Sequence, residues 1–185
     1  MFQSLPLLID KIFSKEGETS MEFEKLIETR RSIRRFQNRR IPKEAIDLFI
    51  KAAMYAPSAR NRRPVHLILI DDKKIIEKLR KLRENAFTFL ETAPFAIVVA
   101  VKNYDTWESD GAIVASYIQL MATNLGLGSC WGHIAGRVEE ETKRILGIPE
   151  NFRVLCVLGI GYPAESKPPH TEEEIDHTRL HKNIW

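Results

Sequence analysis

The residues most able to do chemistry in this chain of 185 amino acids are arginines, which crowd into two short stretches. The first stretch spans residues 30–40 and the second spans residues 60–63. The members are Arg30, Arg31, Arg34, Arg35, Arg39, Arg40, Arg60, Arg62 and Arg63. A guanidinium group donates paired hydrogen bonds to phosphate or carboxylate oxygens, and Ser32 adds a hydroxyl donor. The pattern predicts an anion site, with a solvated basic surface or a nucleic-acid patch as the alternatives.

Other reaction classes lack their motifs. Neither Gly126-Leu-Gly128 nor Gly159-Ile-Gly161 leads from a strand into a helix, so neither predicts a dinucleotide-binding turn. His177 and His181 are four residues apart, but no third metal ligand accompanies them, and we expect surface histidines. No GxSxG motif is present, and Cys130 is interpreted as a small buried thiol.

The composition is that of a globular protein, with 44% hydrophobic residues, 29% charged residues and a net charge of +3. No apolar run approaches the about 18 residues of a membrane span. Cys130 and Cys156 are too few for a disulfide framework, which suits a reducing compartment. We therefore expect a cytoplasmic protein.

The elements that must position the arginines begin with a helix over Phe23, Leu26 and Ile27, which have helical spacing. If this helix continues, Arg30 and Arg34 extend its apolar face, which would require a counter-anion. If it ends near Thr29, the arginines are solvated. The spacing alone leaves both alternatives open.

Further helices and strands follow along the chain. The segment 111–125 is apolar on nearly all sides, which predicts a helix at the centre of a core or shared with another subunit. The mixture of elements favours an α+β or three-layer fold over a doubly wound one. The other expected helices span 42–56, 73–91 and 138–146, strands span 65–70, 95–101 and 153–160, and 128–134 is a strand or extended loop.

Four segments, in sequence order, resemble motifs of the nitroreductase family of flavoproteins, and the match spans roughly residue 21 to the end. They are Arg30–Arg34, like the opening RRS motif; Pro57–Pro64, like the PSxxNxxPW loop; Leu125–Trp131, like the LGLG segment; and Leu158–Glu165, like the GYPxE signature. The resemblance implies an α+β, three-layer fold with a central, mostly antiparallel sheet flanked by helices. It also implies a homodimer with FMN at the subunit interface. Residues 21–185 would form one domain, and residues 1–20 would be an N-terminal extension without an assigned role.

The resemblance also implies which residues bind FMN. From one chain these would be Arg30, Arg31 and Ser32 at the phosphate and ribityl end, and Arg34 near the pyrimidine edge. The partner chain would supply Pro57, Ser58, Ala59 and Asn61. The other side of the ring would be flanked by Cys130, Trp131 and Gly132, and the phosphate would be approached again by Lys167 and His170.

The implied function is that of an FMN-dependent oxidoreductase with NADH or NADPH as electron donor. It would reduce nitroaromatic, quinone or similar conjugated acceptors by ping-pong hydride transfer through flavin N5, with no catalytic side chain. One alternative is specialised flavin chemistry on the same fold, namely dehalogenation or flavin fragmentation. Another is a non-enzymatic nucleic-acid-binding domain that uses the Arg30–Arg40 stretch, although no aromatic stacking platform accompanies it. The main hypothesis expects neither nucleic acid nor membrane as a partner.

Two departures from the family pattern bear on this function. Val65 stands where tryptophan is frequent, and Arg62 and Arg63 stand where neutral residues are common, which leaves substrate preference open. The late basic residue is often arginine, whereas here Lys167 and His170 are available. A lysine supplies a point charge without the bidentate fork, so weaker retention of FMN is expected.

Overall fold

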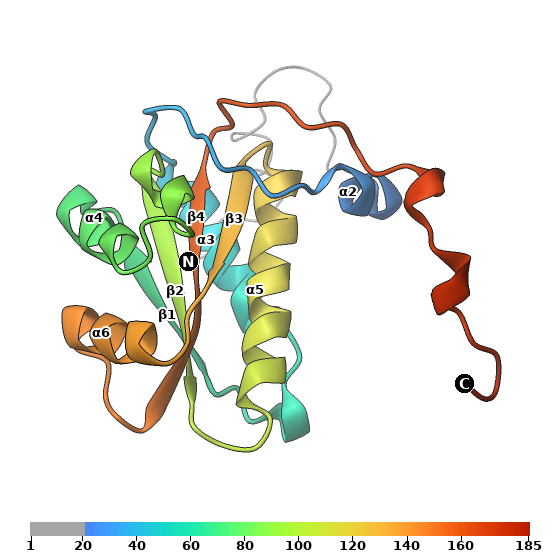
Figure 1. Cartoon of the computed structure of the whole chain (residues 1–185). Coiled ribbons are helices and arrows are strands. Elements are labelled where there is room, and N and C mark those ends of the chain that lie inside the picture. Colours follow the sequence, from blue (N-terminus) through green and yellow to red (C-terminus); the bar gives the residue numbers. More distant parts are fainter. Residues whose placement is uncertain (1–20) are drawn as a thin grey trace, which may run out of the picture.

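The computed structural model describes residues 21–185, and the proposed extension 1–20 lies outside them. Its centre is a sheet of four strands in the order β1-β2-β4-β3, with every neighbouring pair antiparallel (Figure 1). The strands are β1 (Val65–Ile70), β2 (Phe95–Lys102), β3 (Gly128–His133) and β4 (Phe152–Gly161). The predicted antiparallel sheet is confirmed, and segment 128–134 is a strand.

Helices cover both faces of the sheet and give three layers (Figure 1). One face carries α3 (Lys43–Tyr55) and α5 (Trp107–Asn124). The other face carries α4 (Lys73–Lys81) and α6 (Arg137–Leu146). The short helix α2 (Phe23–Thr29) contacts α5 from outside these layers. The α+β, three-layer fold is therefore confirmed.

Strand β2 separates two hydrophobic cores, and seven of its eight residues are buried. Because side chains alternate across a strand, Phe95, Ile97 and Val99 face α3 and α5. Ala96 and Val98 join the core on the α4 side. This two-sided burial explains why the sequence of β2 is apolar without alternation.

The expected helix over 73–91 is wrong beyond Lys81, where α4 ends. A turn follows, then a short 3-10 helix at Thr88–Glu91, and Ala86 is exposed rather than inward. Phe87 and Phe89 are both buried, 1% exposed each, with ring centroids 6.0 Å apart. Residues two apart point to different sides of an α-helix, so burying both rings in one core requires a different backbone.

Helix α2 ends at Thr29, which decides between the two alternatives left open by the sequence. Arg30 is the C-cap residue with an extended backbone conformation, and the chain continues without helix through Arg34. Arg30 and Arg34 therefore do not extend an apolar helix face. They are not uniformly solvated either, since Arg30 is half-buried while Arg34 is exposed.

After β4 the chain runs as an extended tail with 3-10 turns at Glu172–Glu174 and His177–Arg179. The end of this tail projects away from the three layers (Figure 1). Trp185 stacks on His181 with ring centroids 4.1 Å apart and is 98% exposed. In the part of the chain that the structure describes, no helix combines the length and apolar character of a membrane span.

Candidate functional site

The arginine segment, residues 30–34, is fixed to the sheet through its backbone. Ser32 forms a parallel bridge with Ser129 at the start of β3, and the Ile33 N–H donates to the Ser129 carbonyl at 2.9 Å. A Cβ atom built on Gly128 would lie 2.7 Å from the Ile33 Cβ. Only glycine fits this close approach, so Gly128, the first residue of β3, allows the arginine segment to pack directly against the strand.

The tail after β4 runs beside the same segment and adds polar contacts. The Glu165 carboxylate accepts the Arg34 N–H, and this bond lowers the pKa of Glu165. The Lys167 ammonium donates to the Ser32 carbonyl at 2.6 Å. The structure thus brings Lys167 next to the arginine segment, although the two are distant in sequence.

Positive charge at this place exceeds negative charge. Among residues 21–185, no carboxylate lies within ion-pair distance of Arg30 or Arg34. Arg31 is half-buried, donates to the Pro168 carbonyl at 2.7 Å and has its nearest carboxylate, Glu174, at 3.9 Å. Guanidiniums without carboxylate partners favour an external anion, and the phosphate of FMN fits such a donor set.

His170 lies at the edge of this cluster. Its backbone N–H donates to the Glu28 carbonyl at 2.8 Å, and its Nδ1 lies 2.6 Å from the Glu174 carboxylate. The hydrogen bond with His170 lowers the pKa of Glu174. Glu174 therefore sits between His170 and Arg31 as an internal anion.

Strand β3 supplies the three expected ring-flanking residues, but on different faces. Cys130 is 3% exposed, and burial raises the pKa of its thiol, while the nearby charges of Arg34 and Lys167 oppose the rise. Trp131 packs into the other core, on the α3 and α5 side. Gly132 is buried, and a Cβ there would lie 2.8 Å from the Phe87 ring. Cys130 is therefore a buried thiol beside the arginine segment, as interpreted from the sequence.

The second group of predicted residues lies in the loop 57–64, between α3 and β1. Pro57 and Asn61 are exposed, whereas Ser58 and Ala59 are half-buried. The loop is closed internally by the Arg63 N–H, which donates to Ser58 Oγ at 2.9 Å. The Arg63 guanidinium also donates to Asn61 Oδ1 at 3.0 Å.

This loop has a strained backbone. Arg60, Asn61 and Arg63 have φ values of 53°, 54° and 50°. The left-handed region costs an L-residue about 1 kcal/mol because Cβ approaches the backbone, and asparagine tolerates it best. Strain of this kind gathers at binding sites that the surrounding structure holds in place.

A residue that the sequence analysis missed, Asp110, ties the loop to the body of the protein. Asp110 lies in the first turn of α5 and is 2% exposed. Its Oδ1 accepts the Ala59 N–H at 2.8 Å, and its Oδ2 accepts the hydroxyl of Tyr104. The signal in the sequence is weak, because Asp110 is one of three acidic residues in and just before the first turn of a largely apolar helix.

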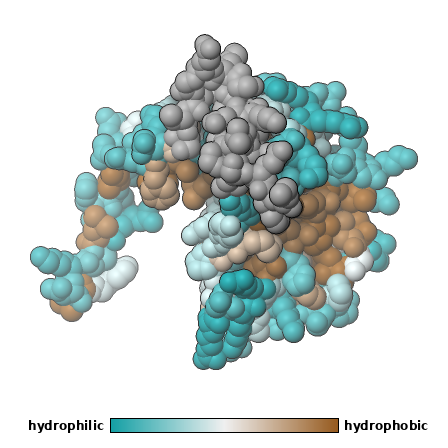
Figure 2. Space-filling view, turned by 180° about the vertical axis from the view of Figure 1, so that it is seen from behind, coloured by the Kyte–Doolittle hydropathy of each residue, from teal (hydrophilic) through white to brown (hydrophobic). Residues whose placement is uncertain are grey.

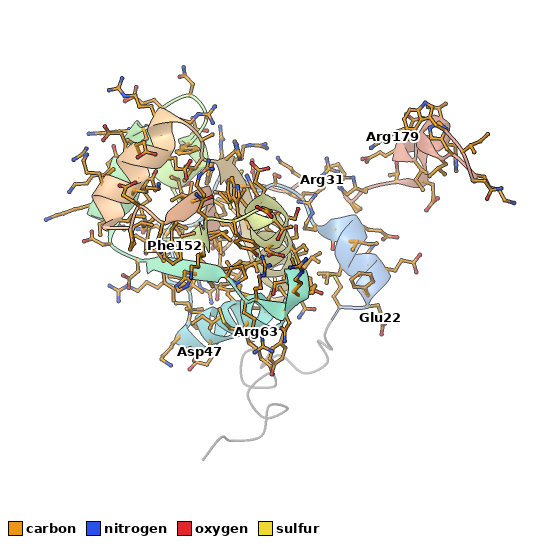
Figure 3. The ribbon with its side chains drawn as sticks, turned by 90° about the horizontal axis from the view of Figure 1, so that it is seen from below. Glu22, Arg31, Asp47, Arg63, Phe152 and Arg179 are labelled. Carbon is orange, nitrogen blue, oxygen red and sulfur yellow. The ribbon has the colours of Figure 1, made fainter. Side chains whose placement is uncertain are left out.

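The two groups of predicted cofactor residues lie at opposite ends of α5 (Figure 1). The loop contacts Asp110 at the start of the helix, whereas Met21, just before α2, donates its N–H to Asn124 Oδ1 at the end. At 1.5 Å per residue these ends are about 20 Å apart. Figure 3 likewise shows Arg31 and Arg63 on separate parts of the molecule. One protomer therefore does not bring both groups to one place.

The side chains at the end of the Arg30–Arg40 stretch contact other parts of the molecule. Arg39 lies over the ring of Tyr162, 3.7 Å from its centroid. Arg39 and Arg40 line an open cavity of about 680 Å³ together with Lys43 and Lys73. Within residues 21–185, no group of three or more His, Cys, Asp or Glu side chains could hold a metal ion.

Comparison with known proteins identifies the family of this chain. The model of the nitroreductase family matches residues 27–88 and 82–162. The chain belongs to the nitroreductase family. A relative from Archaeoglobus fulgidus, named as a candidate NADH dehydrogenase/NAD(P)H nitroreductase, is 38% identical over 173 residues, which cover 87% of this chain and 97% of the relative.

A solved nitroreductase-family structure has the same fold. It is an FMN-dependent nitroreductase from Clostridium difficile, with a TM-score of 0.84 and 35% identity, covering 86% of this chain and 98% of that chain. A second branch of relatives carries another activity in its name. An iodotyrosine deiodinase from Haliscomenobacter hydrossis is 29% identical over 181 residues, covering 79% of this chain and 81% of the relative.

Proposed function

We propose that this nitroreductase-family protein is an FMN-dependent NAD(P)H oxidoreductase that reduces nitroaromatic, quinone or similar conjugated acceptors. The observation that carries the proposal is the cluster of Arg30, Arg31 and Arg34 with Lys167, which has few carboxylates to neutralise it. The similar protein of known structure is described as FMN-dependent, and the Archaeoglobus relative is named for NAD(P)H. Both descriptions agree with an anion site built for a phosphorylated flavin.

The chain's own residues would bind and orient the cofactor. Arg30, Arg31 and Ser32 would hold the phosphate and ribityl end, and Lys167 would add a point charge there. Arg34 would lie at the pyrimidine edge, where its positive charge stabilises added negative charge. When bound, FMN supplies the hydride-transfer chemistry. The protein's contribution is positioning and electrostatics, so no catalytic side chain is assigned.

The complete site requires a second copy of the chain. Within one protomer the loop 57–64 is about 20 Å along α5 from the arginine segment, so the loop would serve the site of the partner. The outer side of α5 carries an apolar groove of about 460 Å³, whose lining includes Phe23, Tyr55 and Tyr117. Phe23 is 68% exposed and Tyr55 71%. A homodimer would cover this groove. Figure 2 shows further hydrophobic surface on the rear of the protomer.

The test is the visible spectrum and turnover of the purified full-length protein. We expect flavin absorption at about 450 nm, with one FMN per chain of a dimer. Either NADH or NADPH should support reduction of a nitroaromatic or a quinone, and comparison of the two fixes the donor. A colourless protein that binds no added FMN would contradict the proposal. Salt-dependent binding of DNA or RNA by such a colourless protein would favour the nucleic-acid alternative.

Reductive dehalogenation is a second candidate, because the iodotyrosine deiodinases are relatives over most of this chain. The assay is iodide release from 3-iodotyrosine under anaerobic conditions with a reductant. Flavin fragmentation, the other specialised chemistry on this fold, is tested by loss of the flavin spectrum with oxygen present. Efficient nitroaromatic or quinone reduction without either product would support the main proposal.

The cytoplasm remains the proposed location. Cys130 and Cys156, the two cysteines of the chain, are both free and buried, so the fold uses no disulfide.

A further inference from the structure

We propose that Asp110 is a positioning residue for cofactor binding. Its buried carboxylate holds the loop 57–64 in the conformation that receives flavin, so it sets the affinity for FMN without contacting it. This role rests on the proposed function, since it concerns the loop assigned to the partner's FMN site. No motif of the family resemblance includes Asp110.

One hydrogen bond of Asp110 reaches across to the loop, while its other oxygen accepts from Tyr104 and Thr106, just before its own helix. Acidic residues in a first helical turn ordinarily interact with the free N–H groups there. Asp110 Oδ1 instead accepts the N–H of Ala59, 51 residues earlier in the chain. A carboxylate that is 2% exposed needs such partners, because burial without them costs free energy. The loop and the carboxylate therefore stabilise each other.

The loop needs an external tie because its backbone is strained. Arg60, Asn61 and Arg63 all have left-handed backbone conformations, which persist only where the surroundings impose them. The bonds from Arg63 to Ser58 and Asn61 lie within the loop and do not anchor it. Asp110 anchors its first half at Ala59, and the Lys102 N–H anchors its end at the Pro64 carbonyl, at 3.1 Å.

Tyr104 links the same carboxylate to the basic side of the loop. The Tyr104 hydroxyl donates to Asp110 Oδ2, and the Arg62 guanidinium lies 5.1 Å from the centroid of the Tyr104 ring. A cation over a tyrosine face is held electrostatically. Asp110 thus fixes Ala59 directly and Arg62 through Tyr104, so its loss should loosen both ends of the strained turn.

The experiment compares FMN dissociation constants of the full-length protein, measured by fluorescence titration, for wild type, Asp110→Leu and Asp110→Asn. Leucine removes both acceptors, and we expect the dissociation constant to rise about 10-fold or more. Asparagine keeps Oδ1 for the Ala59 N–H, and its Nδ2 can donate to the Tyr104 hydroxyl. We therefore expect Asp110→Asn to stay within about 3-fold of wild type.

A stability control separates positioning from general damage. Leu79→Ala creates a cavity in α4, on the opposite face of the sheet, at a residue with no exposed surface. It should lower the melting temperature while leaving the FMN dissociation constant unchanged. At saturating FMN, the visible circular dichroism of the bound flavin should change in Asp110→Leu and not in Leu79→Ala.

Tyr104→Phe keeps the fold testable if Asp110→Leu does not fold, because it removes one donor to the carboxylate and leaves the ring. We expect it to raise the dissociation constant about 3-fold. Unchanged FMN affinity in Asp110→Leu and Tyr104→Phe, or an equal loss in Leu79→Ala, would overturn the role of Asp110. A wild-type protein that binds no FMN would instead overturn the proposed function.

Discussion

The arginine segment and the loop 57–64 are the two halves of the proposed cofactor site, and the chain holds them by different means. The arginine segment pairs through its backbone with Ser129 in β3, and Glu165 and Lys167 brace it from the tail. The loop has a strained backbone and is tied to α5 by the carboxylate of Asp110.

This difference predicts how the two halves of the site respond to amino-acid substitution. The arginine segment has three separate partners, namely the Ser129 backbone and the side chains of Glu165 and Lys167, so its position should depend little on any one of them. The loop is anchored at its end by the Lys102 N–H, but the position of its strained first half depends on one buried acid. We therefore expect substitutions outside the recognisable motifs to disturb the loop more than the arginine segment.

The largest expected effect comes from mixing two defective chains. One carries Arg30→Ala and Arg34→Ala, and the other carries Ser58→Ala and Asn61→Ala. At an FMN concentration that saturates only wild type, each alone should bind no flavin. Refolded together, half of the dimers are mixed and hold one intact site, so roughly a quarter of all sites should bind FMN, as measured by absorbance.

Circular dichroism and gel filtration should show that both parent variants remain folded dimers. A mixture that binds no more FMN than its parents would mean that each site is built by a single chain.

The next effect tests the close packing of the arginine segment against Gly128. Gly128→Val would drive a side chain into Ile33, which lies 2.7 Å from a Cβ at this position. We expect the free energy of unfolding to fall by about 1–3 kcal/mol and FMN affinity to fall about 10-fold. Urea unfolding and FMN titration measure the two.

Gly126→Ala is the matched control for Gly128→Val. Gly126 has a φ of +66° and no atom within 4 Å of a built Cβ. Alanine there should cost about 1 kcal/mol of backbone strain and leave FMN affinity unchanged. An equal loss of affinity in both variants would argue against a specific role for the packing at Gly128.

Much of the fold could be predicted from the sequence, and the exceptions have physical causes. The apolar run of β2 revealed a strand because both of its faces are buried. The helix expected over 73–91 was wrong beyond Lys81, because Phe87 and Phe89 pack together in one core, a tertiary effect that a helical pattern does not contain. The end of α2 at Thr29 could not be decided, since its apolar spacing fits either end.

The candidate site, too, was predicted only in part from the sequence. Resemblance to the family indicated Arg30–Arg34 and Pro57–Pro64, because each is a contiguous motif. Asp110 was missed because its role arises from contact with Ala59, 51 residues away. The separation of the two motifs along α5 was also hidden, since sequence distance does not give the direction in which a helix runs between them.

A smaller effect is expected from pH at the arginine segment. The hydrogen bond from the Arg34 N–H lowers the pKa of Glu165 in the folded protein below its value in the unfolded chain. The ionised carboxylate therefore stabilises the fold fully above the unfolded pKa, and this contribution is lost as pH falls through the lowered folded pKa.

Urea unfolding at a series of pH values from neutral to acidic measures this contribution. The difference in the free energy of unfolding between wild type and Glu165→Gln should be largest near neutral pH and shrink on acidification. A difference that is independent of pH would show that the charge of Glu165 does not act on the segment.

The smallest effect tests the strain in the loop. Arg60 has a φ of 53° and Arg62 a φ of −71°. Glycine removes a left-handed penalty only at Arg60, so Arg60→Gly should be more stable than Arg62→Gly by about 1 kcal/mol. Thermal unfolding of the two variants measures the difference, and equal stability would show that the loop is not strained at Arg60.

The placement of the two half-sites at opposite ends of α5 has a thermodynamic consequence. In the proposed dimer, separation of the subunits would dismantle both flavin sites at once, so flavin retention and subunit association would be linked equilibria. Dilution should release flavin, and added flavin should draw dissociated subunits together. Bound flavin would then contribute to the stability of the dimer.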